Sequence, residues 1–201
     1  MSAPAGEERV EAPASREERP ADPAARFGDL EPTYRYAATI VAVACGASLL
    51  VHFGLGARGL ISAGFVAVLT VLSALDLKHG EIPNRILVPA ALVLLAAQIA
   101  FFHDRAAEWI LAGLGAGLVL LVPALVRRDS VGIGDVKLAT FLGIGLGKAV
   151  IGGLLLGSLI AVPFALWILV RRGVEARKDR MPLGPFLAAG GFLALLLSSS
   201  P

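Results

Sequence analysis

The chain alternates long apolar runs with short polar connections from residue 36 almost to its end. A helix needs about 20 apolar residues to cross a bilayer, with about 17 as the lower limit. Runs close to this length occupy 36–54, 58–76, 86–102, 107–126, 136–150, 151–170 and 183–199. The fifth is short and glycine-rich, so its boundary with the sixth stays open between residues 148 and 153. We therefore expect an all-α, polytopic integral membrane helix bundle of about seven transmembrane helices.

Composition supports the same fold class. Of the 201 residues, 56% are hydrophobic and only 17% are charged, whereas a soluble domain has about 45–50% apolar residues. A soluble protein of this length has too little interior to bury so much apolar surface. Glycines in 111–117 and 143–157 would let neighbouring helices approach closely in a membrane.

Residues 1–35 differ in composition from the rest of the chain. They combine Glu-Glu-Arg repeats with alanine and five prolines, which leaves little apolar surface to bury. No apolar segment precedes residue 36, so we expect no cleavable signal peptide. The sequence predicts a disordered tail at 1–35 and a transmembrane domain at 36–200.

The distribution of basic residues predicts the orientation of the bundle. With seven spans, one face receives 1–35 and the connections near 77–85, 127–137 and 171–182, which together hold 15 of the 18 Lys and Arg residues. The other face receives only Arg58, Arg105 and Lys148. Because basic loops stay in the cytoplasm, we expect the N-terminus there and the C-terminus outside.

Two aspartates stand at ends of apolar runs on the predicted cytoplasmic face. Asp76 follows the unbroken run 65–75, and Asp135 follows Gly132-Ile133-Gly134 at the start of another run. An even number of crossings separates them, so both should lie on one face. Ionisable groups at membrane depth are costly and suggest function. The structural alternatives are that Asp135 is an N-cap for a helix beginning at Val136 and that Asp76 is a solvated helix-end residue.

Together, the two aspartates predict peptide-bond hydrolysis. Two carboxyl groups held close share a proton, because both cannot easily ionise. The ionised group can take a proton from water while the protonated group polarises a peptide carbonyl. This chemistry needs no metal or cofactor, and we expect neither.

Other residues beside the aspartates have supporting roles in this prediction. Lys78 and Lys137 each follow an aspartate by two residues and do not face it on a helix. We expect Lys78 to extend to lipid phosphates and leave the role of Lys137 open. Pro83 should end a helix and fix a turn, and Asn84 suits that turn through local hydrogen bonds.

Other kinds of site have weaker support. Cys45 is the only cysteine, which excludes an internal disulfide and a cysteine-based zinc site. Ser48 and His52 lie four residues apart, but no third group orients them as in a serine protease. A small ion- or proton-coupled transporter using the two aspartates remains the alternative function, and an inactive scaffold is a third possibility.

Three motifs of the chain resemble those of the type IV prepilin peptidases, which are membrane aspartyl proteases of the Gly-x-Gly-Asp type. They are Gly132-Ile133-Gly134-Asp135-Val136-Lys137, Asp76 within Asp-Leu-Lys-His-Gly-Glu-Ile-Pro-Asn, and Met181-Pro182-Leu183-Gly184-Pro185-Phe186-Leu187. The resemblance covers about residues 58–199. It implies that Asp76 and Asp135 are catalytic and that Gly132, Gly134, Pro182, Gly184 and Pro185 support them.

The resemblance also implies a substrate and partners. The family cuts the short basic leader from type IV pilin-like precursors at the cytoplasmic face of the bacterial inner membrane. We therefore expect a prepilin-like precursor and membrane lipid as partners, and no nucleic acid. The oligomeric state stays open. Larger members carry a cytoplasmic insert with paired cysteines that accompanies N-methylation. This chain is similar instead to the short, peptidase-only form of Flp/Tad-type pilus systems.

Overall fold

The computed structural model describes residues 32–80, 82–126, 132–172 and 183–198. Within these ranges every regular element is helical, which confirms the all-α prediction. The α-helices are α2 (Pro32–Phe53), α3 (Ala57–His79), α4 (Asn84–Phe101), α5 (Ala106–Val126), α6 (Ile133–Leu146), α7 (Val150–Arg172) and α8 (Gly184–Leu197). Two short 3-10 turns, η1 (His103–Arg105) and η2 (Gly147–Ala149), join α4 to α5 and α6 to α7.

Several of these helices are long and apolar enough to cross a bilayer. In the described ranges five helical segments meet both criteria, and the fifth, Ile133–Ile168, contains α6, η2 and most of α7. The apolar α8 is shorter, at 14 residues. Large apolar side chains cover the outward faces, for example Ile40 and Val51 on α2. The chain is therefore a polytopic membrane helix bundle, as expected.

Some helix boundaries differ from the apolar runs. Helix α2 begins at Pro32 rather than at residue 36, and α3 continues to His79 and so contains Asp76. Helix α6 begins at Ile133 rather than at Val136, because Gly132 serves as its N-cap. The open boundary between the fifth and sixth runs lies at η2, where Gly147 has a φ of +56° that suits glycine. Residues 1–31 of the expected tail lie outside the described ranges.

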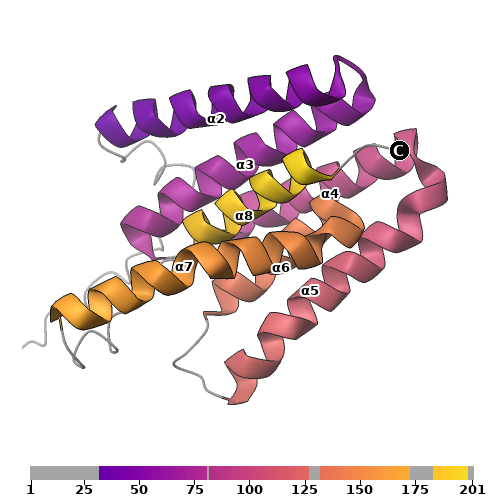
Figure 1. The fold of residues 1–201 in the computed structure, drawn as a ribbon. Helices are drawn as coiled ribbons and strands as arrows, with labels where there is room; N and C mark the ends of the chain where they lie inside the picture. Colours follow the sequence, from indigo (N-terminus) through magenta and orange to yellow (C-terminus); the bar gives the residue numbers. More distant parts are fainter. Residues whose placement is uncertain (1–31, 81, 127–131, 173–182, 199–201) are drawn as a thin grey trace, which may run out of the picture.

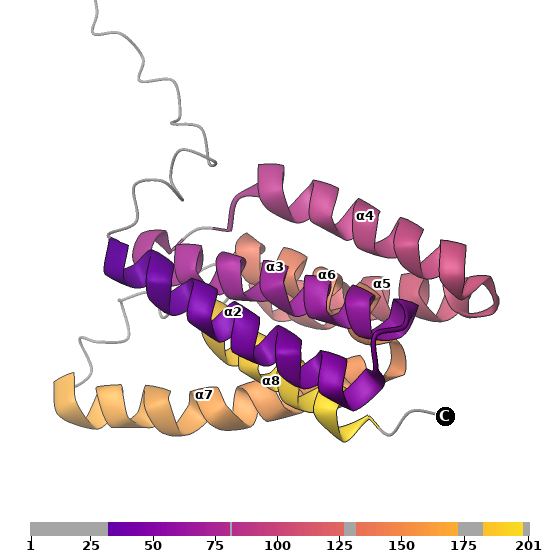
Figure 2. The same ribbon diagram turned by 90° about the horizontal axis from the view of Figure 1, so that it is seen from above.

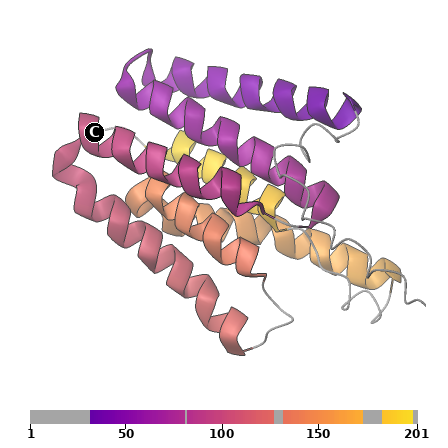
Figure 3. The same cartoon turned by 180° about the vertical axis from the view of Figure 1, so that it is seen from behind.

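Helices α3, α6 and α8 form the interior of the bundle. Helix α8 lies between α3 and α7 in Figure 1, and α4 and α7 lie on opposite sides of this interior in Figure 2. The view from behind shows α5 packed along α6 (Figure 3). Phe65 of α3 and Phe141 of α6 meet at the centre, with their ring centroids 5.1 Å apart. Both side chains are almost fully buried.

Glycines let the neighbouring helices of this interior approach closely. A Cβ atom at Gly190 of α8 would overlap the backbone of Gly153 and Gly157 on α7. A Cβ atom at Gly143 of α6 would overlap the backbone of α5 at Ala112 and Gly113. Small residues at such crossings are the usual means of packing helices in lipid. The expectation of close contact through 111–117 and 143–157 is thus confirmed.

Candidate functional site

Asp76 lies in the last turn of α3 and is buried, with only 6% of its surface exposed. Its Oδ2 atom accepts a hydrogen bond of 2.8 Å from the backbone N–H of Gly184, the first residue of α8. The N-terminus of a helix carries a partial positive charge and stabilises an anion. The alternative that Asp76 is a solvated helix-end residue is therefore wrong, because α8 covers it.

The backbone around Asp76 explains this position. Gly80 ends α3 in the left-handed conformation, with a φ of +62°, and its N–H donates to the Asp76 carbonyl at 2.8 Å. Gly184 has no side chain, and a Cβ atom there would lie 2.6 Å from Asp76 Oδ2. Pro185 follows in the first turn of α8, where proline is tolerated. The bare Gly184 backbone thus permits the contact between the helices.

Asp135 is the third residue of α6 rather than its N-cap, so the N-cap alternative is wrong. Gly132 holds the N-cap position, and its N–H donates to Asp135 Oδ2 at 3.2 Å. In return, the Asp135 N–H donates to the Gly132 carbonyl at 3.0 Å. A carboxylate reaching back to the N-cap N–H is one half of a capping box. It holds the half-buried Asp135 side chain at the start of α6.

A side-chain hydrogen bond links the starts of α4 and α6. Lys137 Nζ donates to Asn84 Oδ1 at 2.9 Å, which assigns a partner to a lysine whose role was open. The expected local turn role of Asn84 is wrong, because Asn84 is the first residue of α4 and its side-chain oxygen accepts from α6. Pro83 is the N-cap of α4, with a φ of −71°, and Gly80 rather than Pro83 ends the preceding helix.

These contacts bring most of the predicted site residues together at one end of the bundle. The end of α3 meets the start of α8, and the starts of α4 and α6 are joined by the Lys137–Asn84 bond. Gly134 faces Ile82 in the α3–α4 connection, where an added Cβ atom would stand 3.5 Å from the isoleucine Cβ. The two aspartates are held by different backbone amides, one from α8 and one from the start of α6.

Lys78 is exposed in the last turn of α3, and its contact with lipid phosphates stays a prediction. Pro182 lies outside the described residues. Among the described residues, no group of three or more His, Cys, Asp and Glu side chains could hold a metal ion. The Ser48 hydroxyl donates to the Ala44 carbonyl within its own helix, as an ordinary helical serine does.

Ser73 is a residue of the site that the sequence analysis did not select. It is buried one turn before Asp76 on the same face of α3. Its hydroxyl donates to the Leu69 carbonyl at 2.7 Å and lies 3.4 Å from the Gly184 carbonyl oxygen. The available signal was its spacing of three residues from Asp76, because such residues share a helix face.

The fold and the site define a helical integral membrane protein with one buried and one half-buried aspartate at the same end of the bundle. Residues 63–166 match the type IV leader peptidase family. The chain belongs to this family of aspartic peptidases, as the three motifs predicted.

Curated relatives include proteins described as prepilin leader peptidase/N-methyltransferases. The chain is 28% identical to a prepilin leader peptidase/N-methyltransferase of Bacillus subtilis, over 84% of this chain and 68% of that protein. It is 30% identical to a protein of the same description from Burkholderia pseudomallei, over 78% of this chain and 52% of that protein. The match thus spans about two thirds of one relative and about half of the other. No solved structure matches the chain.

Proposed function

We propose that this chain is an aspartyl endopeptidase that removes the basic leader from type IV pilin-like precursors. The observation that carries the proposal is the burial of Asp76 against the first amide of α8, at the end of the bundle where Asp135 begins α6. Membership of the type IV leader peptidase family supports the reaction class.

In the proposed reaction, Asp76 and Asp135 act as one pair that shares a proton. The ionised aspartate takes a proton from water, and the water oxygen bonds to the scissile carbonyl carbon. The protonated aspartate gives its proton to the carbonyl oxygen. Breaking the C–N bond of the resulting tetrahedral diol returns a carboxyl product, and the leaving nitrogen takes up a proton. The titration belongs to the pair, so the two roles are not divided between the residues.

The proposed location follows from the charge distribution. The end of the bundle that holds the aspartates also receives 15 of the 18 Lys and Arg residues under a seven-span topology. By the positive-inside rule this face is cytoplasmic. The chain would then lie in the bacterial inner membrane with its active site toward the cytoplasm. An apolar pilin helix could enter the bilayer beside the bundle while its basic leader stays at that surface.

The described residues contain seven α-helices, which supports a seven-span topology. We propose that the peptidase domain covers residues 36–200. We further propose that the chain acts without methylating the new N-terminus, because Cys45 on α2 is its only cysteine. The paired cysteines that accompany N-methylation in larger members have no counterpart in this sequence. Membrane lipid and the precursor are the proposed partners.

An ion-coupled transporter is the alternative function. A transport pathway places ionisable residues near the bilayer midplane. Asp76 lies in the last turn of α3, and Asp135 lies in the first turn of α6. Positions at helix ends favour a reaction at the membrane surface and so support the peptidase.

The proposed function is tested by expressing the chain with a pilin-like precursor that carries a short basic leader. We expect the wild-type chain to shorten the precursor, and a combined Asp76→Asn and Asp135→Asn variant at equal membrane abundance to leave it intact. N-terminal sequencing of the product locates the cut, and its mass reports methylation. If the wild-type chain leaves several such precursors intact and wild-type proteoliposomes take up protons, the result would instead support the transporter.

A further inference from the structure

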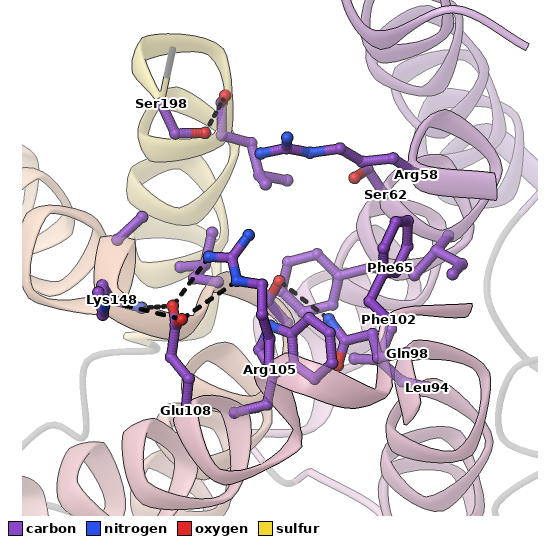
Figure 4. Close-up of a pocket in the computed structure, with 16 residues that line it drawn as sticks. Arg58, Ser62, Phe65, Leu94, Gln98, Phe102, Arg105, Glu108, Lys148 and Ser198 are labelled. Carbon is purple, nitrogen blue, oxygen red and sulfur yellow. Dashed lines mark hydrogen bonds and ion pairs between the residues drawn. The ribbon is translucent and has the colours of Figure 1, made fainter. Parts of the chain in front are cut away.

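A cavity of about 220 Å³ lies at the opposite end of the bundle from the aspartates. It is formed where α3 and α5 begin and where α4, α6 and α8 end, and Figure 4 shows side chains from these elements around one space. A water molecule takes about 30 Å³ in the liquid, so the cavity could hold a group of several non-hydrogen atoms. The proposed reaction makes no use of it.

The cavity gathers three basic side chains from distant parts of the sequence. They are Arg58 at the start of α3, Arg105 in η1 and Lys148 in η2. These are also the only Lys and Arg residues outside the basic tail and connections of the other face. The single carboxylate in the lining is Glu108, so the side chains around the cavity carry a net charge of two positive units.

Glu108 is already fully engaged by its neighbours. It accepts hydrogen bonds from Arg105 Nε at 3.1 Å and Nη2 at 3.0 Å, and from the backbone N–H of Lys148 at 3.1 Å. Arg58 stacks on the Phe53 ring, 4.9 Å from its centroid. Among the described residues, Arg58 has no carboxylate within ion-pair distance. Its charge is therefore available to an anion in the cavity.

A buried acceptor in the same lining points to a ligand that also donates a hydrogen bond. Gln98 is only 5% exposed, and its Nε2 atom donates weakly to the Gly145 carbonyl at 3.5 Å. Its Oε1 atom has no hydrogen-bond partner within the described part of the chain. A buried acceptor without a donor is costly, and native sites satisfy such groups with water or a ligand.

We propose that this cavity binds a phosphate group whose ligand also carries a hydroxyl. The phosphate lies against Arg58 and Arg105, and the hydroxyl donates to Gln98 Oε1. Aromatic side chains beside the cations, Phe102 and Trp109, suit the boundary between headgroups and acyl chains. The glycerol phosphate headgroup of an anionic phospholipid has this chemistry, and so does soluble glycerol phosphate.

The test is a binding titration of the purified full-length chain in detergent, read by native mass spectrometry. Phosphatidylglycerol is compared with a diacylglycerol of the same acyl chains, which lacks the phosphate, and with glycerol phosphate, which lacks the chains. We expect phosphatidylglycerol to bind and diacylglycerol not to compete with it. Glycerol phosphate that binds as tightly as the lipid would identify a soluble ligand, and a requirement for the chains would identify the lipid.

Variants separate this site from general attraction between lipid and basic residues. Arg58→Gln removes a charged partner and should weaken binding about tenfold. Arg171→Gln is the matched control, because Arg171 also stacks on an aromatic ring, Trp167, at 5.1 Å but lies on the other end of the bundle. It should leave binding unchanged.

Gln98→Leu provides a second variant that conserves volume and removes the unpaired acceptor. We expect it to stay folded and to weaken binding about threefold or more, because it loses one hydrogen bond. The proposal would be overturned if Arg58→Gln and Arg171→Gln weaken binding equally, or if Arg58→Gln and Gln98→Leu both leave binding unchanged. Diacylglycerol that binds as tightly as phosphatidylglycerol would also overturn it.

Discussion

At the scale of single residues, the position of Asp76 depends on a glycine in another helix. The Asp76 carboxylate accepts from the Gly184 N–H at 2.8 Å, and no side chain at Gly184 stands between them. This contact orients the carboxylate. Groups that act in catalysis are sensitive to displacements of about 1 Å, so we expect Gly184 to position Asp76 for the proposed reaction.

Gly184→Ala should therefore lower precursor cleavage by about a hundredfold. The new methyl group would lie 2.6 Å from Asp76 Oδ2 and 3.1 Å from its Cβ atom, so the carboxylate must move. The control is Gly115→Ala, where an added Cβ atom meets nothing within 4 Å. Cleavage and membrane abundance are measured for both variants. Wild-type cleavage by Gly184→Ala would show that the Asp76–Gly184 contact does not matter.

The position of both aspartates near helix ends could be predicted from their places at the ends of apolar runs, but their surroundings could not. Asp135 looked like an N-cap because aspartate prefers that position. The helix begins earlier, at Ile133, with Gly132 as its N-cap. The Asp76–Gly184 bond joins residues 108 positions apart, and no local pattern in the sequence reports such a contact.

At the scale of helices, glycines set the distance between α7 and α8. Gly190 of α8 packs directly on the backbone of Gly153 and Gly157. Helices in lipid associate through such close packing rather than through a hydrophobic driving force. Because α8 begins with Gly184, we expect its packing on α7 to influence the position of this glycine, whose N–H donates to Asp76.

Gly190→Ala should destabilise the protein by about 1–3 kcal/mol, because the added methyl group overpacks this crossing. The matched variant is Gly152→Ala on α7, where a Cβ atom meets nothing within 4 Å. Thermal unfolding of the two purified variants in detergent checks the difference. If both unfold at the same temperature as the wild type, the close crossing is not needed for stability.

The bond between Lys137 and Asn84 links α6 to α4 beside the site. Lys137→Met and Asn84→Ala should each slow cleavage by up to about tenfold, because one hydrogen bond between charged and polar groups is lost. The double variant should be no slower than the slower single variant, as expected for two residues that act through one contact. Additive losses in the rate of cleavage would place them in separate roles.

The existence of each helix was more predictable from the sequence than the residue at which it ends. Each apolar run became one helix, because every backbone polar group in lipid needs a partner within the chain. The boundary at η2 depends on a positive φ at Gly147 within a segment that also contains Gly143 and Gly145. Three glycines at alternate positions gave no local basis for choosing which one ends the helix.

At the scale of the whole molecule, the basic residues divide between the two ends of the bundle. Under the proposed seven-span topology, most belong to the tail and the connections on the face with the aspartates, and the remaining three line the cavity at the other end. The proposed orientation places the first end in the cytoplasm. It also places the cavity in contact with the outer leaflet.

This orientation predicts which residues a membrane-impermeant thiol reagent reaches in intact cells. In a Cys45→Ala background, Asp104→Cys in η1 should be labelled from outside, because the Asp104 side chain is 87% exposed. Arg85→Cys, exposed at the start of α4, should be labelled only after the membrane is opened. Labelling of Arg85→Cys in intact cells would reverse the proposed topology.

The central claim is that Asp76 and Asp135 act as one catalytic pair, and single isosteric variants test it most directly. In Asp76→Asn and Asp135→Asn, the amide oxygen can still accept the hydrogen bonds from Gly184 and Gly132. The packing role of each residue is therefore retained while its acid–base role is lost. General acid–base groups contribute about 10²–10⁴-fold to rate.

The measurement is the rate of precursor cleavage by each single variant at equal membrane abundance. We predict that both rates fall at least about a hundredfold while the thermal stability of both variants stays close to that of the wild type. Near-normal cleavage by either variant would contradict the catalytic pair, because a residue needed only for packing would tolerate asparagine.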